Sequence, residues 1–456
     1  MLRTILINYE DPSPTTWFYL SFLLALAVFF KFSRFWSLRN LDLVTLLLLT
    51  PGALLVLEGK VLGGLIWLLV GSAFLLIRLL IDPLMLRRPL LEPNLNVAGL
   101  TFLAAALLAF MMDSVVGREP SAAGLQGARW AQSLLDRREM DPKVLSEMTF
   151  GPTSGVLHAL TLLPARGVVR SIEPLEPEVP YQPDEVPYQP DYETSSQEAA
   201  ARMLALIAHL SVVVALVVCC RAHFGSTPTG VAAATLYLLL PYTSYRVELV
   251  EHVLPASLLI WAVVACRKPV IAGVLLGLAC GFAYFLIFLV PLWIRYFGRA
   301  RSIRFGIALG TTVVLLFTSV ILTSSDLSSA GRQTLALVSW NHWQLNSLER
   351  GTGIWSPDAV YQRVPIFVGF LALVTSLVLR RSRGRFLLLL SGTAAVVLTA
   401  QFWYCQASGT YISWYLPLLL LTVFRPSRSN WLAAERAEES ASQGQQRLRK
   451  SLATTV

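Results

Sequence analysis

Charged residues are scarce in this chain of 456 residues. Only 14% of the residues are Asp, Glu, Lys or Arg, whereas 55% are hydrophobic. A soluble domain carries about a quarter of its residues as charges, so this composition excludes a soluble protein of this size. The net charge of +9 does not indicate nucleic-acid binding, because the basic residues lie between apolar runs and not in clusters on a polar face. The composition predicts an all-α membrane protein.

Several motifs that carry chemistry are also missing. The sequence holds no Walker A loop, no His-Glu-x-x-His zinc motif and no Cys-x-x-Cys pair, which leaves nucleotide hydrolysis and common metalloprotease chemistry without support. The five cysteines lie in or beside apolar segments, and the one long polar loop has none, so a disulfide framework is excluded there. We interpret the cysteines as small residues that pack between membrane helices.

Apolar runs long enough to cross a hydrocarbon core of about 30 Å recur along the chain. Single spans are predicted at 16–33, 41–57, 61–81, 97–115, 201–220, 229–245, 252–266, 305–322, 364–379, 386–403 and 411–424. The run 269–296 is too long for one crossing and has basic residues at both ends, so a hairpin of two short helices is predicted there. The expected fold is an all-α polytopic integral membrane protein with about 13 crossings.

Basic residues set the predicted orientation. Lys and Arg follow alternate spans, and the positive-inside rule places those loops in the cytoplasm. The N-terminus is then outside, the polar tail 425–456 is cytoplasmic, and the expected location is a bacterial inner (plasma) membrane. The first span lacks a basic segment before it and a small-residue cleavage site after it, so we expect an anchor and not a removed signal peptide.

The loop 117–200 falls outside in this topology and differs in charge from the rest of the chain. It holds 7 basic and 13 acidic residues. The segments 128–138 and 143–148 are predicted as short helices on the membrane surface. The sequence Val-Pro-Tyr-Gln-Pro-Asp occurs twice, at 179–184 and 186–191, and this density of proline predicts an extended spacer.

Ionisable residues at the predicted outer boundary are the candidates for chemistry, because a charge beside hydrocarbon is costly. Asp113 ends an apolar run and opens the long outer loop, which suits a base between a hydrophilic acceptor and a lipid-borne donor. The alternative is a solvated aspartate at a helix end. Inside the membrane, His209 fits a neutral histidine bonded to a neighbouring helix better than a proton relay.

A second group lies in one short outer turn and contains Arg246, Glu248, Glu251 and His252. Arg246 suits a phosphate, and either glutamate suits a base or a ligand for a divalent ion. Ordinary solvation of a turn is the alternative explanation.

The second outer loop, 323–363, holds a third group. Its candidates are Arg332, His342, Glu349 and Arg350. Beside a lipid phosphate, these histidine and arginine side chains would stabilise charge on the departing group. The tryptophans of the same loop fit either an interfacial aromatic belt or a platform for a sugar or lipid headgroup.

From about Asp113 to Phe424 the order of features resembles the membrane-embedded GT-C class of glycosyltransferases, such as protein mannosyltransferases and aminoarabinose transferases. The resemblance rests on Met112-Asp113-Ser114 at the start of the outer loop, on Phe224-Gly225 to Leu240-Pro241-Tyr242, on the Ala-Gly-x-x-x-Gly-Leu-Ala pattern at 272–279 and on Tyr411 to Pro417. It implies a GT-C-like module over 97–424, preceded by additional helices in 1–96. The chain departs from the class in those additional helices and in having no second acidic residue directly after Asp113.

The resemblance implies transfer of a sugar from a polyprenyl-phosphate carrier to a glycan, lipid or protein acceptor on the outer face. Asp113 would deprotonate or orient the acceptor hydroxyl, and Glu248 or Glu251 would assist. Arg246 and His252 would bind the carrier phosphate. The donor is activated by its lipid, so no nucleotide is needed, and a divalent metal ion as cofactor is left open.

Two other functions fit the sequence. His342-Trp343-Gln344-Leu345, followed by Gly351 and Gly353, is similar to the outer-loop pattern of O-antigen ligases and polymerases. Arg332 and Arg350 would then bind an undecaprenyl pyrophosphate. A transporter or a non-catalytic protein of envelope assembly is the third hypothesis. A transporter predicts paired ionisable groups near the midplane, where apart from His209 little charge lies.

Overall fold

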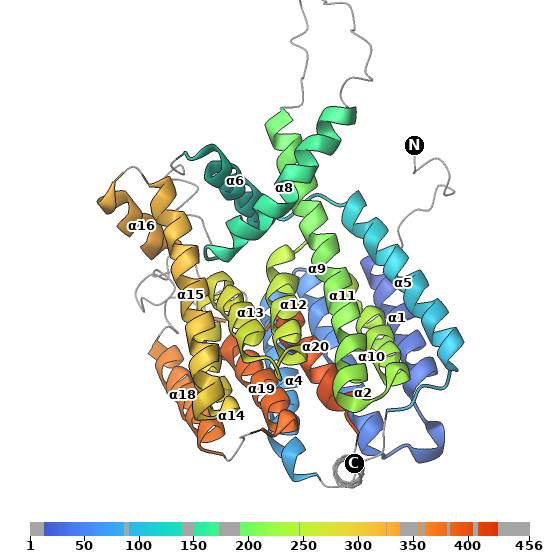
Figure 1. Cartoon of the computed structure of the whole chain (residues 1–456). Coiled ribbons are helices and arrows are strands. Elements are labelled where there is room, and N and C mark those ends of the chain that lie inside the picture. Colours follow the sequence, from blue (N-terminus) through green and yellow to red (C-terminus); the bar gives the residue numbers. More distant parts are fainter. Residues whose placement is uncertain are drawn as a thin grey trace, which may run out of the picture.

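The computed structural model describes residues 13–85, 91–138, 150–172, 192–245, 247–324, 326–337, 354–355, 361–380, 384–404 and 409–426. Within these ranges the chain is all-helical and contains no β-strand. A bundle of helices running along a common direction stands under a smaller helical layer, which lies at the top of Figure 1.

The chain enters the bundle through its N-terminal helices: α1 (Pro14–Phe29), α2 (Leu38–Leu47), α3 (Leu49–Leu57), α4 (Val61–Ile81) and α5 (Val97–Gly117). Ser13 and Asn96 cap α1 and α5 by accepting hydrogen bonds from backbone N–H groups of the first turn. The side chains of α4 join the same apolar core as the later helices. The division of the chain into additional helices in 1–96 and a GT-C-like module over 97–424 stays a prediction.

The layer above the bundle, here called the cap, consists of α6 (Ala122–Asp136), α8 (Thr153–Ile172) and the first turns of α9 (Tyr192–Phe224). Small residues let its helices approach closely, because a side chain on Gly155 would lie 2.6 Å from the indole of Trp130. The helix predicted from residue 128 begins six residues earlier, since Ser121 caps α6. The predicted helix at 143–148 and the proline-rich repeat lie outside the described residues.

The second half of the chain supplies the remaining helices: α10 (Thr227–Leu239), α11 (Pro241–Tyr245), α12 (Val250–Val264), α13 (Pro269–Phe282), α14 (Val290–Phe297), α15 (Arg299–Thr323), α16 (Leu327–Leu337), α18 (Arg363–Leu379), α19 (Phe386–Trp403) and α20 (Ile412–Phe424). The run 269–296 divides at Ala283 into α13 and a second helical arm, which starts as the 3₁₀ helix η5 (Tyr284–Leu289). The helices α12, α19 and α20 are almost wholly buried, whereas α15 lies at the rim of the bundle.

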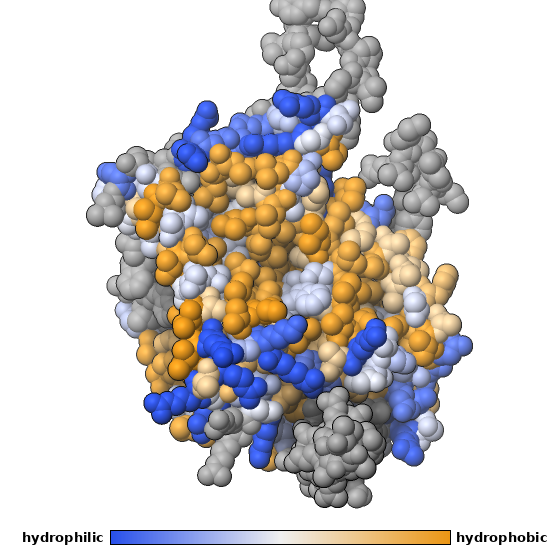
Figure 2. Space-filling model, viewed as in Figure 1, coloured by the Kyte–Doolittle hydropathy of each residue, from blue (hydrophilic) through white to orange (hydrophobic). Residues whose placement is uncertain are grey.

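Apolar side chains cover the sides of the bundle in a broad band between two hydrophilic ends, as Figure 2 shows. Among the described residues, six helices are long and apolar enough to cross a membrane, and seven more apolar helices are shorter, with 10–17 residues. These features are those of a membrane protein. The count of 13 crossings stays a prediction.

Side-chain contacts define two ends of the bundle. At the capped end, Trp17 in the first turn of α1 bonds to Ser244, and the Trp414 indole at the start of α20 bonds to the Glu251 carbonyl. At the opposite end, α20 finishes with Arg425 bound to Asp82 after α4. Exposed basic residues gather there, so we call it the basic end; they are Arg34, Arg221, Arg267, Lys268, Arg295, Arg299, Arg301, Arg304, Arg380 and Arg385.

Candidate functional site

The start of α12 carries three of the candidate residues to the underside of the cap. Glu248 lies in the turn before the helix, and Glu251 and His252 lie in its first turn. The imidazole Nε2 of His209 on α9 donates a hydrogen bond to the Val247 carbonyl at 3.0 Å, which fixes the turn against the bundle. His209 thus bonds to a neighbouring segment of the chain.

Glu248 forms an ion pair with Arg118, the residue that ends α5. The guanidinium Nη1 lies 3.2 Å from the Glu248 Oε2, and the two side chains are 38% and 22% exposed. Arg202 of α9 donates from Nε to the Arg118 carbonyl at 3.2 Å and so fixes the backbone of that residue. The sequence analysis did not identify Arg118, because 130 positions separate it from Glu248.

Glu251 is bound to the cap through Ser121. The hydroxyl of Ser121 donates to the Glu251 Oε2 at 2.8 Å, and the same oxygen of Ser121 accepts the backbone N–H of Gly124 at 3.0 Å. One serine therefore caps α6 and orients the carboxylate. Glu251 remains partly exposed.

His252 belongs to a layer of rings beneath the two glutamates. It is 8% exposed and stacks on Tyr411 with a centroid distance of 4.9 Å, and Tyr411 stacks on Trp414 at 4.0 Å. Trp414 in turn stacks on Phe285 at 4.6 Å. These rings are buried, so they form a rigid wall under the carboxylates and not an open platform for a sugar.

Two of the other candidates, Asp113 and Arg332, have no bond to this group. Asp113 is exposed on α5, on the side opposite the buried Met111 and Val115, and has no hydrogen bond or ion pair with any described residue. Arg332 is exposed on α16. Arg246, His342 and Arg350, together with Glu349, lie outside the described residues, so their predicted roles stay predictions.

Within the described ranges, no three His, Cys, Asp or Glu side chains are arranged to hold a metal ion. Cys219, Cys220 and Cys266 are buried free thiols, and Cys280 is a partly buried free thiol. Cys266 accepts a hydrogen bond from the Tyr296 hydroxyl at 3.6 Å and lies 3.9 Å from the His223 Nε2.

A buried ionic network at the basic end was missed in the sequence. Arg78 of α4 binds both oxygens of Asp42 at 2.5 and 3.0 Å and binds Asp82 at 2.9 Å. Arg425 binds the second oxygen of Asp82 at 2.7 Å and its carbonyl at 2.8 Å. The sequence did hold a signal for this network: Asp42, Arg78 and Asp82 lie at the ends of predicted spans, where a charged side chain needs a partner.

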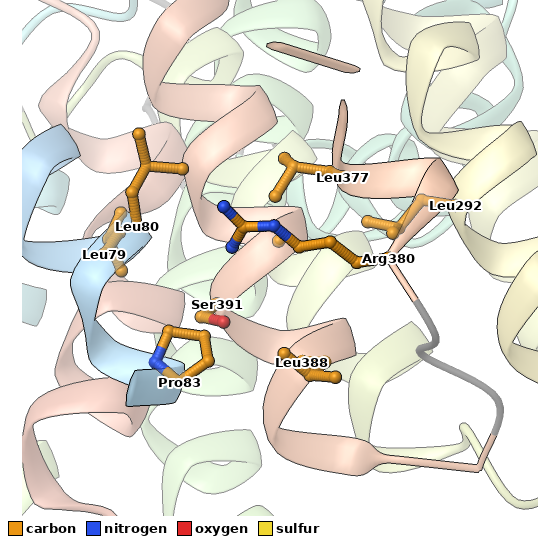
Figure 3. A pocket seen from close by; sticks show the side chains of 9 residues that line it. Leu79, Leu80, Pro83, Leu292, Leu377, Arg380, Leu388 and Ser391 are labelled. Atoms are coloured by element: carbon orange, nitrogen blue, oxygen red, sulfur yellow. The ribbon is translucent and has the colours of Figure 1, made fainter. Parts of the chain in front are cut away.

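A small cavity of about 10 Å³ lies at the same end, between α4, α14, α18 and α19. Its walls are mostly leucine, and the Arg380 guanidinium points across it toward Leu79, Leu80 and Pro83 (Figure 3). The cavity has room for about one water molecule and is too small for a substrate.

Comparison of the chain with protein-family models, curated proteins and solved structures found no match. The likeness to GT-C glycosyltransferases therefore rests on the quoted sequence motifs alone.

Proposed function

We propose that the protein transfers a sugar from a polyprenyl-phosphate carrier to an acceptor at the capped end, which faces the outside. The observation that carries the proposal is the convergence of Glu248, Glu251, Arg118 and Ser121 at the boundary between a polar cap and an apolar bundle. A lipid-borne donor and a hydrophilic acceptor meet at such a boundary. The GT-C-like order of motifs supports the same function.

Glu251 is the base that the geometry favours. An ionised carboxylate has about four acceptor positions, so the hydrogen bond from Ser121 orients Glu251 without using up its capacity to take a proton. The acceptor hydroxyl would attack the anomeric carbon and lose its proton to Glu251, while the bond from that carbon to the phosphate oxygen breaks. The carrier phosphate leaves with the bonding electrons.

Arg118 is the described cation best placed for that phosphate. Its guanidinium carries five N–H donors, pairs with Glu248 and is partly exposed, and such a group suits a phosphate oxygen. Glu248 would hold the guanidinium in place before the lipid arrives. Arg246 and His252 remain candidates for the same phosphate, and Asp113 for orienting the acceptor.

We also propose the full topology of 13 crossings, with the N-terminus outside and the tail 425–456 in the cytoplasm of a bacterial inner membrane. Two observations support this topology. The start of α1 contacts Ser244 at the capped end, whereas α4 and α20 finish together at Asp82 and Arg425, where exposed Lys and Arg gather. A membrane-impermeant thiol reagent added outside whole cells should label Glu58→Cys and spare Arg301→Cys. The reverse labelling would overturn the orientation.

Substitution of the base is the direct test of the function. In vesicles supplied with a polyprenyl-phosphate-sugar and an envelope acceptor extract, Glu251→Gln should slow transfer by about 10²- to 10⁴-fold, since it removes a general base. Glu58→Gln removes the same charge from an exposed turn at the capped end and should transfer sugar like the wild type. Transfer by Glu251→Gln at the wild-type rate would reject the assignment.

The same assay separates the neighbouring hypotheses. Loss of transfer in Asp113→Asn would extend the GT-C-like mechanism to that residue. Loss in His342→Ala and Arg350→Ala, with full activity in Glu251→Gln and Asp113→Asn, would favour the ligase or polymerase function.

A further inference from the structure

A surface groove of about 740 Å³ runs along α13 and α15, away from the candidate site. Its walls are apolar over most of their length, with Val274 and Leu278 on one side and Ile307 and Leu315 on the other. Arg304 is the one charged residue among those that line it. The volume lies within the range of about 300 to 1,000 Å³ that is typical of small-molecule sites.

The groove exists because the two helices approach very closely. A side chain added at Gly273 would lie 2.5 Å from the Phe305 carbonyl oxygen, and one added at Gly277 would lie 2.9 Å from Thr312. Backbones in such contact leave a furrow beside the line where they meet. Only 17% of the most apolar 18-residue stretch of α15 is buried, so this face of the bundle is open to lipid.

The end of the groove at Arg304 is strongly positive. The helices α13 and α15 both begin there, at Pro269 and Arg299, so the positive ends of two helix dipoles lie beside the guanidinium. Arg304 is exposed and has no hydrogen bond or ion pair with any described residue. Hydrophilic side chains form a band across the lower ends of these helices in Figure 2.

The groove is long enough for an acyl chain of one leaflet. From Arg304 to Ser319 an α-helix rises about 22 Å, which exceeds half of a hydrocarbon core of about 30 Å. An apolar furrow of that length, with an unpaired cation at its membrane-surface end, complements a chain attached to an anionic head.

We propose that this groove binds one anionic phospholipid of the leaflet at the basic end. The lipid phosphate contacts Arg304, and one acyl chain lies between α13 and α15. The site is independent of the proposed sugar transfer, because its lining and that of the Glu248 and Glu251 group share no residue.

Native mass spectrometry of the purified full-length chain tests the proposal. With phosphatidylglycerol and phosphatidylcholine offered separately, the wild type should retain one phosphatidylglycerol and favour it about fivefold, the effect of about one basic contact at a membrane surface. Arg304→Gln should remove that preference. Arg299→Gln removes another exposed charge of α15, outside the groove lining, and should keep the preference.

A second pair of variants tests where the acyl chain lies. Thr311→Phe places a ring in the groove from an exposed position, so it should lower retention of both lipids; Val314→Phe, an exposed position outside the lining, should not. Equal retention of the two lipids by the wild type, or an unchanged preference in Arg304→Gln, would overturn the phosphate contact. Unchanged retention in Thr311→Phe would overturn the placement of the chain.

Discussion

The two ends of the bundle hold their charges in different ways. At the capped end, Glu248 pairs with Arg118 and Glu251 accepts a hydrogen bond from Ser121, and both glutamate side chains reach solvent. At the basic end, Asp42, Asp82 and Arg425 are at most 4% exposed. Arg78 forms ion pairs with both aspartates, and Arg425 forms an ion pair with Asp82.

The difference indicates separate roles for the two ends. Burying a charge costs several kcal/mol unless its partners are well placed, and the network of two acids and two arginines meets that condition. Such a network holds α2, α4 and α20 together but has no spare group for a substrate. The carboxylates at the capped end are oriented and still accessible, which a reaction requires.

The largest effect on stability is expected at Asp82. Asp82→Asn removes the carboxylate that the buried Arg425 binds, so the variant should lose about 3–5 kcal/mol of unfolding free energy. Thermal unfolding in detergent measures the loss. Glu58→Gln removes one exposed carboxylate and should melt like the wild type.

A rescue variant sharpens this prediction. Asp82→Asn combined with Arg425→Gln removes one charge of each sign and leaves Arg78 paired with Asp42, so it should recover a large part of the loss. A double variant less stable than Asp82→Asn alone would show that the network is not held together by charge balance.

The next effect is a pH dependence in the cap. Burial lowers the pKa of His158 to about 4. The hydrogen bond from its Nδ1 to the Ser154 carbonyl favours the charged form and opposes part of this shift. The unfolded cap therefore binds a proton more readily between pH 6.5 and about 4, and its stability should fall by about 3 kcal/mol as the pH decreases through this window.

Hydrogen exchange in α6 and α8 at pH 4.5 and 7.5 measures that change. His158→Asn keeps an amide donor toward the Ser154 carbonyl but does not titrate, so its exchange should show little of the pH dependence. An equal dependence in both proteins would assign it to other groups.

The smallest effect on stability is expected at Arg118. Its ion pair with Glu248 is partly exposed and screened, so Arg118→Gln should cost about 0.2–1 kcal/mol. Under the proposed function the same variant should weaken use of the lipid donor much more than it changes the melting temperature. Comparing the apparent KM for the donor with thermal unfolding separates the two outcomes. A variant that melts far below the wild type with an unchanged KM would contradict the comparison between the ends.

Helix positions followed closely from the sequence where charge or turn residues bounded an apolar run. The predicted spans 61–81 and 386–403 coincide with α4 and α19. Helix α9 is longer than its predicted span 201–220, because its first turns leave the apolar part of the bundle and pack in the cap. Hydropathy reports on the apolar part of such a helix alone.

The candidate site was predictable only where it is local in sequence. Glu248, Glu251 and His252 stand within five residues, so their grouping needed no fold. The partners Arg118 and Ser121 each lie 130 positions from their glutamates and emerge only from the packing of α5 and α6 on α12. Arg425 was interpreted as the start of a basic tail, because its buried partner Asp82 is 343 positions away.

The central claim is that the capped end carries the chemistry and the basic end the stability. Its most direct test measures sugar transfer per folded molecule and thermal unfolding for Glu251→Gln and Asp82→Asn in the same vesicles. We predict that Glu251→Gln melts like the wild type but does not transfer sugar. Asp82→Asn should melt early, while its folded fraction transfers sugar at the wild-type rate. An active Glu251→Gln beside a folded but inactive Asp82→Asn would contradict the account.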